Sequence, residues 1–301
     1  MKQIEQFNHD LNQSDGNRYE RWADYRKKID QFIEPLIKSF KPSEHRLLIL
    51  GAGNCDDLNL GTLQKYFKSI TLADIDLNSV KKGLKKQHLV ENDFELIGVD
   101  FSGFEKILFF DHLIDEILSC SKEDEIESLL FNKWSGLVDY QFIDSYKNSF
   151  DAIIVSPIYT QLVYHQVLNA TKVISELNYP SHLIKFIEIR MLDEMPRVID
   201  RFNQNVFHLL KKAGLLFVLS DIFQSRIDEV FYHQITQSID SLDQMDLLYE
   251  NYAGTYGYGL GDYGLDSLAS LIEPKKHTWI IWPFEEQLHM IVKLECFFIS
   301  Q

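Results

Sequence analysis

The sequence lacks long apolar runs and an excess of positive charge, and it contains few cysteines. No apolar run reaches the roughly 18 residues that a membrane span requires, and the polar first 20 residues lack the apolar stretch of a signal peptide. We therefore expect a cytoplasmic protein without membrane contacts. Three cysteines, Cys55, Cys120 and Cys296, are far apart and form no CxxC pair, so neither a disulfide framework nor a metal site is expected.

The charge balance is acidic. Thirty lysines and arginines stand against forty-five aspartates and glutamates, which gives a formal net charge of −15. Such a surface repels polyanions, and non-specific affinity for nucleic acid comes mostly from cationic contacts to phosphate. Nucleic acid is therefore not an expected partner. The one basic cluster, KKGLKK at 81–86, is interpreted as the solvated face of a helix.

Apolar runs of strand length alternate with helical patterns along the chain, which is typical of a parallel sheet covered by helices on both faces. Only a short turn separates the last two runs, so those two strands must be antiparallel to each other. The pattern predicts an α/β protein with a doubly wound seven-stranded sheet and an antiparallel last strand. The expected strands are residues 46–50, 69–73, 94–99, 151–156, 215–220, 278–282 and 289–299.

Two segments outside this pattern suggest additions to one domain. Residues 1–45 are expected to form a helical N-terminal extension packed on a core domain of residues 46–301. The insertions at 102–149 and 222–277 have no assigned role, although the first is mainly helical in pattern. Within the second, the tyrosine- and glycine-rich stretch 252–263 could be a mobile lid, a wall of the site or an ordinary surface loop.

Helix boundaries can also be predicted. Asn78 can cap the helix that follows the second strand, and capping is the expected use of Asp76 as well. Before the fifth strand, a helix is expected to end at residues 211–214. Lys211 and Lys212 would interact favourably with the negative C-terminal end of the helix dipole, and Gly214 would terminate the helix.

The stretch LLILGAGNCDD at 47–57 predicts a buried strand that runs into a glycine turn. A dinucleotide-binding turn has the pattern GxGxxG, in which the glycines allow a tight bend, approach of the pyrophosphate and close helix packing. Here Asp56 replaces the third glycine and Asp57 follows it. Carboxylates at that helix start would repel a pyrophosphate. The expected ligand therefore has no phosphate at this position.

S-adenosylmethionine satisfies this requirement, and the chain from Leu47 onward resembles the class I S-adenosylmethionine-dependent methyltransferases. LLILGAGNCDD stands at the glycine-rich first motif, ITLADID at the second-strand segment, and IGVDFSG after the third strand. The resemblance implies a Rossmann-like fold whose last strand lies beside the fifth. It also implies that Asp74 binds the ribose, that Asp100 and Phe101 contact the adenine, and that the remaining cofactor contacts come from Gly51, Ala52, Gly53, Ile75, Ser156 and Pro157.

Acceptor residues are less well defined, because methyl transfer needs placement of an acceptor lone pair and exclusion of water more than a fixed catalytic motif. SPIY at 156–159 resembles the motif of methyltransferases that act on planar amino nitrogens, with Ile158 in place of the second proline, although a chance likeness is an equal reading. Tyr159 and His165 are the candidate catalytic residues, and Gln161 could also line the cleft. The alternative for His165 is a packed core histidine.

Three classes of function follow from these observations. The favoured one is a methyltransferase for a small-molecule acceptor. A second is another adenosine-ligand enzyme, either an aminopropyl transferase or an NAD-dependent dehydrogenase, and Asp56 and Asp57 count against the dehydrogenase. The third is a catalytically silent cofactor-binding scaffold, since Ile49 and Cys55 stand where the first motif often has an acid and a third glycine. Oligomeric state does not follow from the sequence, and a homodimer is allowed.

Overall fold

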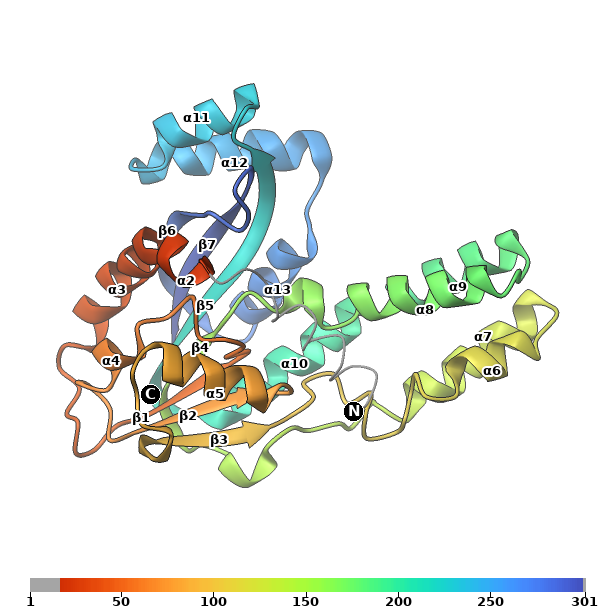
Figure 1. Cartoon of the computed structure of the whole chain (residues 1–301), viewed down its shortest axis with the longest axis horizontal. Helices are drawn as coiled ribbons and strands as arrows, with labels where there is room; N and C mark the ends of the chain where they lie inside the picture. Colours follow the sequence, from red (N-terminus) through yellow and green to blue (C-terminus); the bar gives the residue numbers. More distant parts are fainter. Residues whose placement is uncertain (1–16, 300–301) are drawn as a thin grey trace.

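A seven-stranded sheet forms the centre of the computed structural model, which describes residues 17–299 (Figure 1). The strand order is β3-β2-β1-β4-β5-β7-β6, with β1 to β5 parallel and β7 antiparallel to both of its neighbours. The predicted doubly wound sheet, with the last strand beside the fifth, is confirmed. The strands are β1 (Arg46–Leu50), β2 (Ser69–Asp74), β3 (Phe94–Gly98), β4 (Phe150–Val155), β5 (Leu210–Arg226), β6 (Glu273–Trp282) and β7 (Leu288–Phe298).

Helices cover both faces of the sheet because its central strands alternate apolar side chains between two buried faces. Leu48 and Leu50 pack into one core, whereas Leu47 and Ile49 of the same strand pack into the other. The first core is closed by α6 (Leu113–Leu118), α7 (Glu123–Ser135), α8 (Tyr164–Glu176), α9 (Ser181–Leu192), α10 (Met195–Leu209) and α13 (Leu260–Ala269). The second is closed by α3 (Ala23–Ile37), α4 (Leu60–Leu63) and α5 (Leu77–Lys86).

Two helical hairpins, α6–α7 and α8–α9, project side by side away from the sheet (Figure 1). The helical pattern expected for the 102–149 insertion is confirmed by α6 and α7. The remaining short elements are α2 (Arg18–Arg21) and three 3-10 turns, η1 (Glu91–Asp93), η2 (Asp144–Tyr146) and η3 (Tyr159–Gln161). No helix between residues 17 and 299 combines the length and the apolar character that crossing a membrane would demand.

Strand β5 is much longer than the 215–220 expected from sequence. Helix α10 ends at Leu209, so Lys211, Lys212 and Gly214 lie in the strand, and the expectation that they form the end of the helix is wrong. Ala213, with φ of 61°, takes a left-handed conformation here. Beyond the end of β4, the strand continues beside β7 as far as Arg226. Helices α11 (Val230–Ser238) and α12 (Leu242–Tyr256) cover this extension through a small third core (Figure 1).

The tyrosine- and glycine-rich stretch 252–263 is not a loop, because most of it belongs to α12 and α13. Two glycines of α13 permit close packing. A Cβ at Gly261 would lie 2.3 Å from the Asp221 carbonyl oxygen, and a Cβ at Gly264, just beyond the stretch, would lie 2.4 Å from the Tyr159 ring. The expectation of an ordinary surface loop is therefore wrong for the helical part of this stretch.

Candidate active site

A cavity of about 440 Å³ opens at the carboxyl edge of the sheet, where the strand order reverses between β1 and β4. Ligands of doubly wound sheets bind at such a switch point. All the residues predicted to contact the cofactor line this one cavity, and their roles in binding stay predictions. They are Gly51, Ala52, Gly53, Asp74, Ile75, Asp100, Phe101, Ser156 and Pro157.

The glycine turn at residues 51–53 follows β1 directly and lines the cavity. Gly51 and Gly53 have φ of 74° and 47°, a left-handed conformation that strains other residues. A Cβ at Gly51 would also lie 2.4 Å from Ile158 Cγ2. The backbone N–H of Gly51 donates to the Ala73 carbonyl, and that of Gly53 donates to Asp74 Oδ2 at 2.8 Å. The turn is thus tied to the end of β2.

Asp74 and Asp76 have different surroundings at that strand end. Asp74 lines the cavity, accepts from the Asp76 N–H through its second oxygen at 2.8 Å, and has a pKa raised by burial. Asp76 caps α5 by accepting from the Ser79 N–H at 3.1 Å, which confirms the expected capping role. Asn78 lies inside α5 and not at its cap, so that expectation is wrong.

The acid after β3 is held by its own loop. Asp100 accepts from the N–H groups of Ser102 and Glu105, each at 2.8 Å, and the Tyr140 hydroxyl donates to the Asp100 carbonyl at 2.6 Å. Phe101 lies edge-on to Phe142 with ring centroids 5.3 Å apart. This loop therefore presents a fixed carboxylate and an aromatic ring to the cavity.

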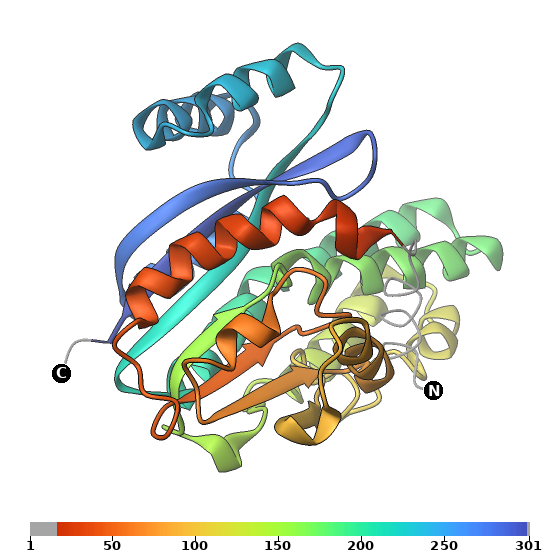
Figure 2. The ribbon, with the colours of Figure 1, turned by 60° about the vertical axis from the view of Figure 1, so that its left-hand side comes forward.

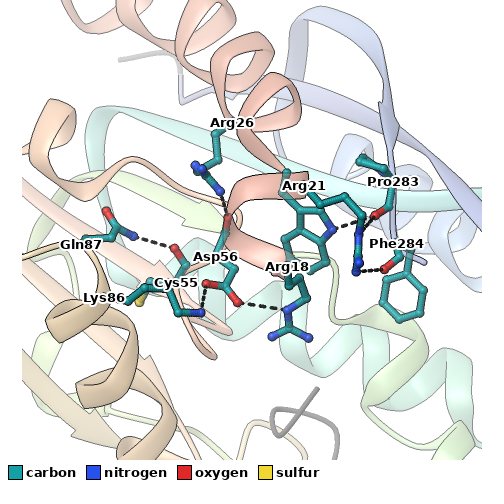
Figure 3. A network of polar contacts seen from close by, with 10 residues as sticks. Arg18, Arg21, Arg26, Cys55, Asp56, Lys86, Gln87, Pro283 and Phe284 are labelled. Carbon is teal, nitrogen blue, oxygen red and sulfur yellow. Dashed lines mark hydrogen bonds and ion pairs between the residues drawn. The ribbon is translucent and has the colours of Figure 1, made fainter. Parts of the chain in front are cut away.

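The two aspartates after the glycine turn differ in charge compensation. Buried Asp56 forms ion pairs with Arg18 at 3.0 Å and Lys86 at 2.7 Å, and Arg26 donates to its carbonyl at 2.7 Å (Figure 3). Asp57 is also buried but forms no salt bridge within residues 17–299, and burial raises its pKa to about 6. Asp57 therefore makes this part of the cavity unfavourable for a phosphate.

The N-terminal helices are both part of the core and part of the cavity wall. Helix α3 lies along the β6–β7 side of the sheet (Figure 2). Trp22 Nε1 donates to the Pro283 carbonyl at 2.8 Å, and Arg21 donates to the carbonyls of Pro283 and Phe284 at 3.1 and 3.0 Å (Figure 3). Because Arg18 and Trp22 also line the cavity, this segment joins the glycine turn to the β6–β7 hairpin.

The far wall of the cavity comes from the extension of β5 and the β6–β7 hairpin, and sequence reasoning did not assign it. Gln224 of β5 and Trp282 of β6 both pair with Met290 of β7, so the three form one row across the strands, and all three line the cavity. Asp221 and Phe284 complete this wall. The signal for Asp221 was present, because it follows the apolar run of β5 as Asp74 follows that of β2.

The two candidate catalytic residues are placed differently. Tyr159 is buried, donates its hydroxyl to Asn203 Oδ1 at 3.0 Å and does not line the cavity, so the expectation that it lines the cleft is wrong. The η3 turn directs its ring into the core against Gly264. His165 and Gln161 do line the cavity. Burial lowers the pKa of His165, which favours the neutral imidazole.

Metal-ligating residues are not clustered in the part of the chain that the structure describes. No group of three or more histidine, cysteine, aspartate or glutamate side chains between residues 17 and 299 is arranged to hold a metal ion.

No protein-family model matches the chain, and no curated protein matches it significantly. Similar solved structures include the N-methyltransferase NodS from Bradyrhizobium japonicum WM9 with S-adenosylhomocysteine, at 12% identity over 99% of each chain and a TM-score of 0.44. A methyltransferase from Methanosarcina mazei has 11% identity, covering 88% of this chain and 97% of its own, with a TM-score of 0.44. A putative methyltransferase from Methanococcus maripaludis has 9% identity, covering 100% and 95%, with a TM-score of 0.41.

With TM-scores below 0.5, these neighbours do not decide the fold, which rests on the strand order. That order, with a reversed seventh strand between β5 and β6, is the one implied by the resemblance to class I S-adenosylmethionine-dependent methyltransferases. The chain has the fold of this class.

Proposed function

We propose that the protein is an S-adenosylmethionine-dependent methyltransferase that acts on a small-molecule acceptor. One observation carries the proposal: residues from four separate strand ends, each predicted to contact the cofactor, line a single cavity at the switch point of the sheet. The buried carboxylate of Asp57, which forms no salt bridge within residues 17–299, lies in the same cavity. This combination suits an adenosine ligand that carries positive charge and no phosphate.

The residues present fit S-adenosylmethionine. Asp74 has both oxygens fixed by backbone donors and can accept from the ribose hydroxyls, while Asp100 and Phe101 offer a carboxylate and a ring for the adenine. Ser156 Oγ is buried and makes no hydrogen bond of normal geometry within the described residues, although it lies near enough to Asp57 to influence its pKa. Such a hydroxyl suits a polar ligand group. When bound, the cofactor supplies an electrophilic methyl group.

Several finer statements belong to the same proposal. Residues 1–45 would be an extension of a cofactor domain of residues 46–301, and the net charge of −15 disfavours nucleic acid as a partner. We expect a cytoplasmic protein, and a homodimer remains allowed. The alternatives are an aminopropyl transferase and a catalytically silent scaffold. An assay of methyl transfer distinguishes both from the proposed methyltransferase, since neither passes a methyl group to an acceptor.

Calorimetric titration with S-adenosylhomocysteine and with NAD tests the proposal. We expect binding of S-adenosylhomocysteine and much weaker or no binding of NAD, because a pyrophosphate would be placed near the buried Asp57 carboxylate. Tight binding of NAD without binding of S-adenosylhomocysteine would assign the chain to the dehydrogenases. Binding of S-adenosylhomocysteine without methyl transfer to any acceptor would support the alternative of a catalytically silent cofactor-binding scaffold.

A further inference from the structure

Two buried side-chain oxygens on the β4–β5 side of the cavity have no hydrogen-bond partner within residues 17–299. They are Gln166 Oε1 and Asp221 Oδ1, and both residues line the cavity. Gln166 is only 8% exposed. Buried polar groups in folded proteins are nearly always hydrogen-bonded, and an unmet one raises the free energy. The cavity therefore suits a ligand that brings hydrogen-bond donors to these oxygens, while Trp282 Nε1, also without a partner within residues 17–299, is an unmet donor in the same wall.

Asp221 is the charged member of this set. Its second oxygen accepts from the Thr160 hydroxyl at 3.3 Å, and no salt bridge reaches it from the residues that the structure describes. Asp56, by contrast, has two cationic partners. Burial raises the pKa of Asp221 to about 6, so the carboxylate is the main form at neutral pH yet has no compensating charge.

Aromatic and thioether side chains surround the remaining space. Trp22, Trp282 and Phe284 line the cavity. The rings of Trp22 and Trp282 pack edge-to-face with centroids 4.9 Å apart, and those of Trp282 and Phe284 form a similar pair at 5.0 Å. Met290 lies in the same wall. Faces of aromatic rings attract cations, and their bodies provide contact for an apolar ligand.

The position of Asp221 separates it from the cofactor contacts. In the sheet order, the ends of β3, β2 and β1 carry Asp100, Asp74 and the glycine turn, whereas Asp221 belongs to β5 on the other side of β4. A cofactor with its adenine at Asp100 and its ribose at Asp74 leaves the β5–β7–β6 wall for the acceptor. An anionic acceptor would be repelled there, and a neutral alcohol would bring one donor and no compensating charge.

We propose that the methyl acceptor is an amine with an aromatic or other apolar body, and that Asp221 is the carboxylate that holds its nitrogen. This inference rests on the proposed function. An ammonium group brings three donors and a positive charge to the unmet oxygens. Before transfer the ammonium gives one proton to Asp221; the nitrogen lone pair then forms the N–CH3 bond as the S–CH3 bond breaks, and the electron pair of that bond goes to sulfur.

The test is a competition between isosteric ligands in the presence of saturating S-adenosylhomocysteine. Calorimetry at about pH 7.5, where an alkylamine is protonated, compares 2-phenylethylamine with 2-phenylethanol and 3-phenylpropionate. We expect the amine to bind about tenfold or more tightly than the alcohol, the scale of a charge-assisted hydrogen bond, and the acid to bind weakest. With S-adenosylmethionine, labelled methyl should pass to the amine.

The matched variants are Asp221→Asn and Asp228→Asn, the second at an exposed carboxylate of the same chain segment. Asp221→Asn should remove the preference for the amine, while Asp228→Asn should keep it. S-adenosylhomocysteine should bind all three proteins alike, so loss of cofactor binding in the unmodified protein would instead count against the proposed function. With cofactor binding intact, equal binding of amine and alcohol, no binding of the amine, or a preference that survives in Asp221→Asn would overturn the inference.

Discussion

Five aspartates line the cavity, and their surroundings divide them into two groups. Asp56, Asp74 and Asp100 are held by cations or backbone N–H groups, which stabilise a carboxylate. Within residues 17–299, Asp57 and Asp221 form no salt bridge and accept no backbone N–H of another residue, and burial raises the pKa of each to about 6. The carboxylates of the first group are held in place by the protein itself, whereas those of the second leave negative charge for a ligand to compensate.

Substitution of Asp74 tests the expected ribose contact. Asp74→Ala should weaken binding of S-adenosylhomocysteine about ten- to a hundredfold, because hydrogen bonds to a charged group are lost and the Gly53 turn loses its acceptor. Asp76→Ala should leave the affinity nearly unchanged and lower the free energy of unfolding by about 1 kcal/mol through loss of the α5 cap. Calorimetry and urea denaturation measure the two effects. The reverse ranking of the two variants would show that the cofactor has been placed wrongly.

Asp221 should make the stability of the ligand-free protein depend on pH. The pKa of Asp221 in the folded state, about 6, lies above the usual 3.8, so the protonated carboxyl stabilises the folded state relative to the ionised one. This contribution to the free energy of unfolding is fully present below about pH 4 and is lost as the pH rises through 6. The Thr160 hydroxyl donates a hydrogen bond to Asp221. The pKa of Tyr25 in α3 is raised by burial and, to a smaller extent, by the charges of Asp57 and Asp221. At about pH 7.5, Asp221→Asn should therefore raise the free energy of unfolding by about 1 to 3 kcal/mol.

Urea denaturation at about pH 7.5 and pH 5 checks this sign, since the gain should shrink at the lower pH as the carboxyl of the unmodified protein protonates. Asp228→Asn, at an exposed position, is the control and should change little at either pH. A variant less stable than the parent at the higher pH would mean that Asp221 is compensated in the folded protein.

At the scale of elements, sequence patterns located β1 to β4 to within one residue at each end and failed where packing overrides local preference. β1 is correct at both ends because Leu47 to Leu50 are buried on both faces. The extension of β5 was missed because its residues alternate in burial and pair with β7 alone beyond β4. The α12–α13 stretch was missed because glycine disfavours helices, a preference outweighed here by close packing at Gly261 and Gly264.

The N-terminal helices α2 and α3 should contribute strongly to stability through Trp22, which lies between them. The indole is 4% exposed, packs against Trp282 and donates to the Pro283 carbonyl. Trp22→Ala should lower the free energy of unfolding by about 3 to 5 kcal/mol, whereas Trp22→Phe, which keeps a ring but loses the hydrogen bond, should cost less. Phe131→Ala, at a side chain 72% exposed, is the control for denaturation. Equal stability of Trp22→Ala and the parent would contradict the packing role.

At the scale of the whole molecule, the order of the strands determines the site. The sequence predicted the parallel run and the antiparallel end, and from these the edge at which Gly51, Asp74 and Asp100 would meet. It did not predict that the wall opposite would come from β5, β6 and β7, because this depends on how far β5 and β7 run past the end of β4. Contacts between the N-terminal helices and the β6–β7 hairpin are likewise set by tertiary packing.

A crystal structure with S-adenosylhomocysteine tests the central claim most directly. The predicted result is a ligand in the cavity at the β1–β4 switch point, with its ribose hydroxyls on Asp74, its adenine beside Asp100 and Phe101, and its sulfur directed toward the space before Asp221. The result that would contradict the account is an adenosine bound elsewhere in the molecule, or one in this cavity whose ribose makes no contact with Asp74.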